Sequence, residues 1–487
     1  MSLSIIIGTI VFSLLCVFLL MALSTQSMNM LVVLGVFPLL LYLVNRPDVW
    51  LIVIIALWQS MLKFPQAPSS LLACHIFAFL LTIFLVIYRL IAKVQRRKSP
   101  VRKYVWMFAA VLLVTIYFRG IGIRFFGSDL WGGASYAILL IFLGLFLSAD
   151  TLTLSPRSWK VSLIIMCFFS LIPTLGELIY LVSGGAVKAQ YYFIQASGFT
   201  AKTLENIETG NGLSRYNVMG GAMFIYLPFF LFRKPFSGKT VIISVVIIII
   251  AMASAALAGF RSAVINQIVF LTMYTVLGSD EIKLRRGFIM VLCLGSLLLI
   301  AAAFAEHLPL SMQRALSFVP FANVSWEARS DALGTTVWRL EMWKRAIYDI
   351  PQYLFLGQGF AFNPRELMDI IAAGTYIRDW AIVTRAYHNG LLSLILIFGL
   401  PGLIAGMGFL LSACRAYNRE RHLEWKNDDL KRIYNVIYIQ FLTQFVCFLV
   451  IYGDTQVSFP SFLFLAMVLE GMAKTREMLQ QGSITTG

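Results

Sequence analysis

Residues 385–406 read RAYHNGLLSLILIFGLPGLIAG. The part that follows Asn389 is apolar and long enough to begin a membrane span, which needs about 20 apolar residues. Arg385 and His388 stand directly before it, although the chain holds only four histidines. Ionisable side chains are costly at a membrane boundary, so they are usually functional or paired. The stretch therefore predicts a membrane helix with candidate functional groups at its N-terminal end.

The composition extends this prediction to the whole chain. Of the 487 residues, 59% are hydrophobic and 13% are charged, whereas soluble domains carry about 25% charged residues. We therefore predict an all-α, polytopic integral membrane protein. The early apolar runs are crowded and the last is short, so we expect about 12–14 transmembrane helices. The fourteen candidate runs lie near 3–23, 29–45, 48–64, 71–92, 104–118, 134–149, 161–183, 217–232, 240–259, 263–277, 288–305, 389–412, 433–452 and 459–473.

The net charge of +16 is found both in nucleic-acid binders and in membrane proteins with basic cytoplasmic loops. With fourteen spans, the most basic segments all fall on one side, which favours the second class; nucleic acid is not expected as a partner. By the positive-inside rule this side is the cytoplasm, and both termini lie there. The basic segments are 93–103, 156–160, 233–239, 283–287 and 415–432.

The outer side receives the long loop 306–388, which contains as many acidic as basic residues. Loops of this length are usually functional or contain helices of their own. In residues 335–350 charged and apolar side chains recur at helical spacing, and Pro351 favours an end just after them. We predict a short amphipathic helix there that lies across the outer membrane face.

Several arginines are predicted at the outer ends of spans. Arg215 precedes one span, and Arg261 lies in a very short turn between two others. Such arginines either snorkel to lipid phosphate or hold an anionic substrate, and both interpretations are open for Arg261. The long loop brings Arg339, Arg385 and His388 to the same side.

Arginine binds phosphate oxygens through a planar fork, and histidine accepts protons near neutral pH. A single histidine at a helix mouth is more often structural than catalytic. The arginines around His388 favour a phosphate-bearing substrate with His388 as proton acceptor.

Sequence motifs for other chemistry are missing. The chain has no GxxxxGK[ST], HExxH or CxxC motif, and the outer loops have no DxD. The six cysteines lie within or at the ends of apolar runs, which is typical of small residues packed in a membrane. We predict neither a metal site nor a cofactor.

Residues 200–412 resemble the bacterial O-antigen ligases and O-antigen polymerases. Four segments follow the order of that family: GLSRYNVMGG, AGFRSAV, WRLEMWKRAIYDIPQYLFLGQGFAFNP and YHNGLLSLILIFGLPGLI. Within the third segment, Arg339, Trp343, Gly357 and Gly359 match the family's run from arginine and tryptophan to a glycine turn. No single segment is specific, but the ordered set is. The resulting division is N-terminal spans in 1–200, a catalytic region in 201–412 that includes the periplasmic loop 306–388, and C-terminal spans in 413–487.

The resemblance implies a metal-independent glycosyltransferase of the bacterial inner membrane whose active site faces the periplasm. The implied donor is an oligosaccharide on undecaprenyl diphosphate, and the implied acceptor is a glycan or a second lipid-linked glycan. Membrane lipids, a chain-length regulator and a flippase are further implied partners. Arg215 and Arg261 would hold the diphosphate, and His388 would act on the acceptor hydroxyl. The implied substrate contacts are Arg339, Trp343, Arg385 and Asn389.

The sequence departs from the family in two respects. Phe260 stands before Arg261, where the family more often has serine, and the first half of the chain has more candidate spans than a simple ligase needs. These departures favour polymerisation of an O-antigen or exopolysaccharide over ligation to lipid A core. A transporter or flippase of lipid-linked glycans is a further alternative. It is disfavoured because transporters usually show related halves and mid-span charges, and this chain shows neither.

Overall fold

The computed structural model describes residues 47–60, 73–92, 99–123, 127–152, 154–183, 223–236, 238–278, 292, 295–372 and 381–482. Every named element in these residues is helical, and the one isolated β-bridge joins Trp131 to Phe362. The predicted all-α fold is thus confirmed. The helices are α3 (Pro47–Ser60), α4 (Ala73–Ala92), α5 (Pro100–Arg119), α6 (Gly133–Leu147), α7 (Pro156–Phe169), α8 (Leu171–Val182), α11 (Leu227–Leu231), α12 (Thr240–Leu257), α13 (Arg261–Leu277), α15 (Leu310–Leu316), α16 (Trp326–Tyr353), α17 (Pro364–Ala372), α19 (Gly390–Arg421), α20 (Asp428–Val450) and α21 (Thr455–Gln480).

Six helical segments of the described chain are long and apolar enough to cross a membrane. This finding confirms the prediction of a polytopic membrane protein. The total of 12–14 spans stays a prediction, because the runs 3–23 and 29–45 lie outside the described residues. The six segments are Pro100–Arg119, Pro156–Gly176, Thr240–Leu257, Gly390–Arg421, Asp428–Val450 and Thr455–Gln480, and α3, α4, α6 and α13 contain shorter apolar helices.

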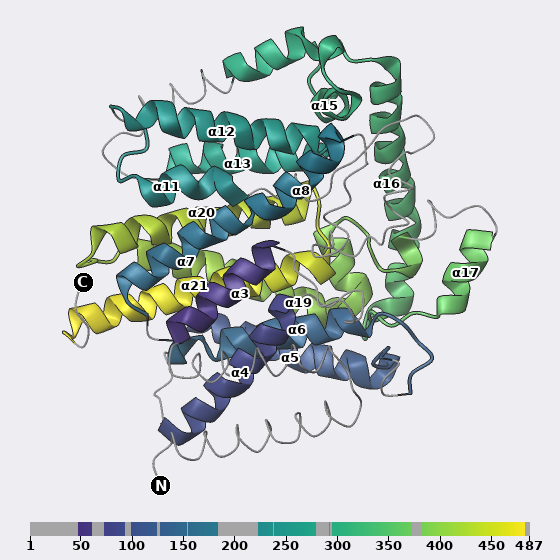
Figure 1. Cartoon of the computed structure of the whole chain (residues 1–487). Coiled ribbons are helices and arrows are strands. Elements are labelled where there is room, and N and C mark those ends of the chain that lie inside the picture. The colour runs from purple at the N-terminus through teal and green to yellow at the C-terminus, as the bar shows by residue number, and fades with distance from the viewer. Residues whose placement is uncertain are drawn as a thin grey trace, which may run out of the picture.

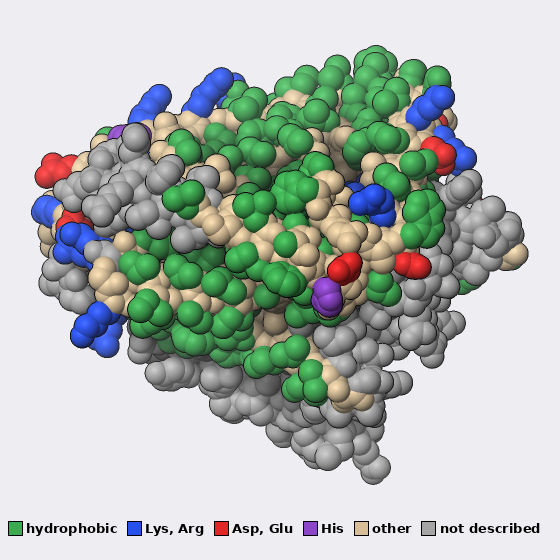
Figure 2. Space-filling view, turned by 90° about the horizontal axis from the view of Figure 1, so that it is seen from above, with side chains coloured by type: hydrophobic (Ala, Val, Ile, Leu, Met, Phe, Trp, Pro, Cys, Tyr) green, Lys and Arg blue, Asp and Glu red, His purple; other side chains and the backbone are tan. Residues whose placement is uncertain are grey.

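The spanning helices form one bundle, with α16 lying across its ends. In Figure 1, α12, α13, α20 and α21 run across the view, and α16 stands nearly perpendicular to them at their right-hand ends. Figure 2 shows a broad hydrophobic band on the bundle, with Lys and Arg side chains toward the ends. Helix α19 packs against α5, α16, α20 and α21, so it connects the bundle to the transverse helix.

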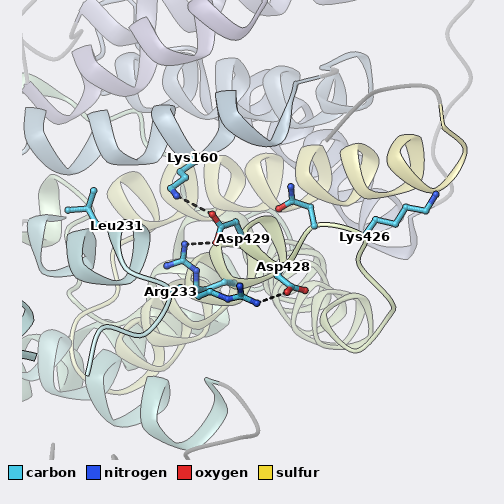
Figure 3. Close-up of a pocket in the computed structure, with 8 residues that line it drawn as sticks. Lys160, Leu231, Arg233, Lys426, Asp428 and Asp429 are labelled. Carbon is cyan, nitrogen blue, oxygen red and sulfur yellow. Dashed lines mark hydrogen bonds and ion pairs between the residues drawn. The ribbon is translucent and has the colours of Figure 1, made fainter. Parts of the chain in front are cut away.

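Three of the predicted basic segments lie at the end of the bundle away from α16, and we call this end the basic face; the segment 283–287 lies outside the described residues. Lys160 pairs with Asp429 at 3.1 Å, and Arg233 pairs with Asp428 at 2.8 Å, around a polar pocket (Figure 3). Residues from 156–160, 233–239 and 415–432 therefore lie together, as the basic loops predicted. The face with α16 is the opposite face.

The helix predicted over 335–350 is present but longer. It is the C-terminal part of α16, which begins at Trp326 after the N-cap Ser325, whose Oγ accepts the Ala328 N–H at 3.3 Å. The helix also continues past Pro351 to Tyr353. The predicted start was wrong because Ser325 is the N-cap, ten residues before the predicted start. The predicted end was wrong because Pro351 lies inside the last turn of the helix and not after it.

Helix α19 is broken inside the membrane-spanning run. Gly399 has φ 69° and ψ −172°, and Pro401 has no N–H to give to the carbonyl of Ile397. The Gly359 N–H bonds to that carbonyl instead, at 2.9 Å. Leu400 N–H turns to the Leu354 carbonyl at 2.6 Å.

The same break frees the carbonyl of Leu396, which accepts the Gln358 N–H at 2.8 Å. Unsatisfied backbone groups cost several kcal/mol in a membrane. The turn 354–359 after α16 avoids this cost, because it supplies the hydrogen bonds that the break in α19 leaves unmade. This backbone contact fixes the C-terminal end of α16 on the bundle. Gly357 has φ 64°, and a Cβ there would overlap the backbone of Ile397.

We predict that Gly357→Ala lowers the thermal unfolding midpoint in detergent markedly more than Gly238→Ala does. Both glycines have a positive φ, but a Cβ at Gly238 would meet nothing within 4 Å. Gly238→Ala therefore carries only the cost of holding alanine at a positive φ, which is about 1 kcal/mol, whereas Gly357→Ala adds the steric overlap. Equal shifts for the two variants would contradict the proposed contact between the turn and α19.

Candidate active site

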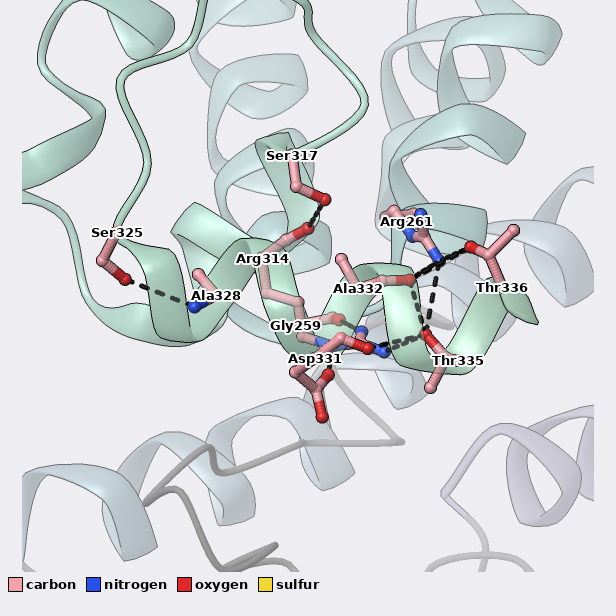
Figure 4. Close-up of polar contacts among 10 residues, drawn as sticks. All are labelled: Gly259, Arg261, Arg314, Ser317, Ser325, Ala328, Asp331, Ala332, Thr335 and Thr336. Atoms are coloured by element: carbon pink, nitrogen blue, oxygen red, sulfur yellow. Dashed lines mark hydrogen bonds and ion pairs between the residues drawn. The ribbon is translucent and has the colours of Figure 1, made fainter. Parts of the chain in front are cut away.

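Arg261 begins α13 and points to the transverse helix. The turn that precedes it is tight because Gly259 adopts φ 74°. The half-buried side chain donates through Nη2 to the carbonyl of Ala332 at 2.9 Å. It also donates to Thr336 Oγ1 at 2.9 Å and to Thr335 Oγ1 at 3.3 Å (Figure 4). The guanidinium is therefore held by α16 at the opposite face of the bundle, consistent with the predicted position at the membrane boundary.

Arg314 is a second arginine in this site, and it was not among the residues predicted from the sequence. It pairs with Asp331, donates to the Gly259 carbonyl and reaches Thr335 Oγ1 at 3.3 Å. The side chain is 5% exposed and that of Asp331 is 12% exposed, so the ion pair is nearly buried. Arg314 thus ties α15 and α16 to the turn before Arg261. Its position in a loop with mixed charges gave no sequence signal for this role.

His388 lies in a constrained segment directly before the N-terminus of α19. It has φ 52° and Arg385 has φ 65°, and these are the two non-glycine residues with positive φ in the described chain. Such conformations cost about 1–3 kcal/mol each and persist only where the surroundings hold them. Strain of this kind clusters at functional sites, which makes the segment 385–388 a candidate site.

Aromatic rings hold the imidazole of His388. It stacks on Tyr452 with centroids 4.8 Å apart and an interplanar angle of 29°. It also meets Trp338 edge-on at 5.7 Å. Its Nδ1 is shut off from solvent and has no hydrogen-bond partner among the described residues.

Arg339 is close to both Arg261 and His388. Its guanidinium is 5.9 Å from the centre of the Tyr452 ring, and its charge acts on both Arg261 and His388. Three of the predicted site residues therefore come together, although they belong to α13, α16 and the segment before α19. Together with Arg314 they make the site positive, which suits an anionic group.

Burial lowers the pKa of His388 to about 3, and the positive charge of Arg339 acts in the same direction. The imidazole is consequently neutral at physiological pH. A neutral ring can accept a proton, and an anion bound to Arg339 would offset the repulsion that protonation creates.

The other predicted residues support the segment before α19. Asn389 is the N-cap of α19, and its Oδ1 accepts the Leu392 N–H at 3.1 Å. Trp343 Nε1 donates to the Tyr387 carbonyl at 2.7 Å. Arg385 Nη1 donates to the Ile382 carbonyl at 3.2 Å. Contacts of these residues with substrate stay predictions.

Arg215, the remaining predicted catalytic residue, lies outside the described residues. Within the part of the chain that the structure describes, no group of three or more His, Cys, Asp or Glu side chains is arranged to hold a metal ion.

Residues 240–406 match the family model described as O-Antigen ligase. We call this matched region the O-antigen ligase domain, after the family that it is similar to. A comparison with curated proteins gives no match. The O-antigen ligase domain runs from the start of α12 into the second half of the broken α19, and so includes Arg261, Arg314, Arg339 and His388. The domain limits predicted from sequence, 1–200, 201–412 and 413–487, stay predictions.

We predict that Asp331→Asn destabilises the O-antigen ligase domain by about 3–5 kcal/mol, because it leaves the buried charge of Arg314 uncompensated. Asp428→Asn is the matched control. It breaks the Arg233 pair on the basic face, whose side chains are 72% and 73% exposed, so its effect should stay within about 1 kcal/mol.

Thermal unfolding in detergent of the two variants and the wild type measures the difference. A midpoint for Asp331→Asn equal to that of Asp428→Asn would show that the Arg314–Asp331 pair does not hold α15 against α16.

Proposed function

We propose that this protein transfers a glycan from undecaprenyl diphosphate to a hydroxyl group of an acceptor glycan. The family domain indicates O-antigen ligase-type glycan transfer in a membrane. The observation that carries the finer proposal is that Arg261 and His388 both lie close to Arg339 of α16. This arrangement combines a site for the diphosphate with a proton acceptor at the membrane surface.

The arginines would bind the donor diphosphate. Arg261 and Arg339 carry planar forks that suit phosphate oxygens, and their charges oppose the negative charge that grows on the leaving diphosphate. The hydroxyl groups of Thr335 and Thr336 fix Arg261 before the substrate arrives, so little reorganisation is required. Arg215 is proposed as a further diphosphate ligand from the resemblance alone.

The reaction is a substitution at the anomeric carbon of the donor sugar. The acceptor oxygen forms the new glycosidic bond while the bond from the anomeric carbon to the diphosphate oxygen breaks. Its electron pair leaves with undecaprenyl diphosphate. The proton of the acceptor hydroxyl passes to Nε2 of His388, because Nδ1 is enclosed. No metal ion is required in this scheme, since the arginines supply the positive charge.

The two faces of the bundle suggest the orientation. The basic face would be cytoplasmic by the positive-inside rule, and the opposite face, with α16 and His388, would be periplasmic. The C-terminus would be cytoplasmic, because Lys426 on the basic face donates to the carbonyls of Leu479 and Gln480, both at 3.1 Å. We propose the bacterial inner membrane as the location, with the N-terminus on the same side as the C-terminus.

The acceptor decides between a polymerase and a ligase. We favour polymerisation because the sequence departs from the family at the residue before Arg261 and in the number of candidate spans in its first half. The residue before Arg261 is Phe260, which is the N-cap of α13 and makes no side-chain cap. A serine at this position would cap the helix beside Arg261. A chain-length regulator and a flippase are proposed partners of the polymerase.

We predict that His388→Ala lowers the rate of glycan transfer about 100-fold or more, because it removes the proton acceptor. Arg261→Ala should lower it about 100- to 1,000-fold through lost stabilisation of the leaving diphosphate. The matched control is Arg345→Ala, which removes an exposed cation from the same transverse helix and should keep the rate.

The assay uses purified protein in detergent with chelator, undecaprenyl-diphosphate glycan from the host, and both acceptors. Longer lipid-linked glycans identify a polymerase, and transfer to lipid A core identifies a ligase with the same site. Movement of lipid-linked glycan across vesicles without any transfer would overturn the proposal in favour of a transporter.

A further inference from the structure

Residues 451–456 comprise the turn between α20 and α21 together with the first two residues of α21, and we call them the turn 451–456. This turn lies outside the O-antigen ligase domain, yet it forms one wall of the His388 site. Its Tyr452 ring stacks on His388 at 4.8 Å and lies 5.9 Å from the guanidinium of Arg339. A single side chain of this turn thus contacts both a proposed proton acceptor and a proposed diphosphate ligand.

We propose that Tyr452 is a positioning residue that fixes the imidazole of His388 and the guanidinium of Arg339 relative to one another. The inference rests on the proposed function for what the two groups do. The reaction needs both groups on the same donor and acceptor pair, and they come from different elements. Contact with the same Tyr452 ring fixes the position of the imidazole relative to the guanidinium, which the chain between them does not do.

The turn is anchored to the segment that carries His388. A Cβ on Gly453 would overlap the backbone of Gly390, so the two chains approach as closely as glycine allows. Ser393 Oγ donates to the Gly453 carbonyl at 3.3 Å, and Gln456 Nε2 donates to the Thr384 carbonyl at 2.8 Å. The ring of Tyr452 therefore cannot move far without moving the segment 384–390.

The anchoring extends to the N-terminal half of the chain. Ser135 at the start of α6 donates to Oε1 of Gln456 at 3.1 Å. Asp454 caps α21, where its Oδ1 accepts the Gln456 N–H at 3.2 Å. The turn is consequently fixed by three helices, as a rigid support for a catalytic group should be.

An aromatic residue suits this position for two reasons. The π-face attracts the guanidinium of Arg339, and the flat ring stacks on imidazole. The ring also covers His388, whose left-handed backbone has to be held by its surroundings. Leucine would fill only part of the space of the ring and would provide neither a π-face nor a flat stacking surface.

Several charged groups surround this part of the site. Arg339 from α16 acts on His388 and on Tyr452, Asp454 from the turn acts on Tyr452, and Arg385 acts on Tyr387 in the segment of His388. Burial is the larger cause of the low pKa of His388, ahead of Arg339. Removing the ring admits water, so the pKa should rise from about 3 toward the ordinary value of 6.5.

The first experiment is an NMR titration of labelled histidine between about pH 5 and 8. It compares full-length wild type with Tyr452→Phe and Tyr452→Leu in detergent. The chain has four histidines, so a His388→Gln variant assigns the signal. We expect His388 to stay neutral throughout in wild type and Tyr452→Phe. In Tyr452→Leu it should begin to protonate at the acid end.

The second experiment measures glycan transfer by the same proteins, with Tyr348→Ala as the control because that tyrosine is 75% exposed on α16. We expect Tyr452→Leu to lower kcat about 100-fold, which corresponds to a displacement of about 1 Å in a catalytic group. An acid limb should also appear toward about pH 5 as protonated His388 accumulates. Tyr452→Phe should retain the wild-type kcat and pH profile.

The outcomes separate the two proposals. An unchanged His388 titration in folded Tyr452→Leu would overturn the positioning role, whatever the enzyme does. A uniform loss of rate without an acid limb would also overturn it, because a general structural defect does not shift a pH profile. Wild type that transfers no glycan would overturn the proposed function, while the NMR result would still report whether Tyr452 positions His388.

Discussion

The interrupted backbone of α19 is the constraint on which the site depends. Gly399 and Pro401 leave the carbonyls of Leu396 and Ile397 without helical partners inside an apolar bundle. The turn 354–359 satisfies both, so the transverse helix α16 is joined to a spanning helix by backbone hydrogen bonds. Because side chains are not needed for these bonds, the join tolerates sequence change at most positions but requires glycine where the chains touch. The position of α16, and with it that of Arg339, follows from this join.

A second constraint is the cost of gathering positive charge at a membrane boundary. The charges of Arg314 and Arg339 both oppose that of Arg261 there, and Asp331 offsets part of this repulsion. Threonine hydroxyls and backbone carbonyls satisfy Arg261 without neutralising it. The hydrogen bonds of Arg261 thus hold its guanidinium without neutralising its charge, which is the arrangement expected where a bound anion supplies negative charge.

The sequence predicted the class of fold because composition and apolar runs report directly on the membrane. It also placed Arg261, Arg339 and His388 on one side, since each stands near the end of a span or within the loop between spans. It did not reveal Arg314 or Tyr452. Their roles depend on contacts between residues far apart in the chain, such as Arg314 with the Gly259 carbonyl, and no local pattern encodes these. The boundaries of α16 were missed for a local reason, because Ser325 as a cap was overlooked.

The segment 384–390 shows how the fold supports a strained site. Two left-handed residues there, at about 1–3 kcal/mol each, would relax in an isolated loop. Trp343 from α16 holds the Tyr387 carbonyl, Gln456 from α21 holds the Thr384 carbonyl, and Asn389 caps α19. These contacts come from three helices and bind mainly backbone atoms, so they fix the path of the chain without using the imidazole of His388. A histidine with a merely structural role would not need its backbone held in this way while its Nδ1 is left without a partner among the described residues.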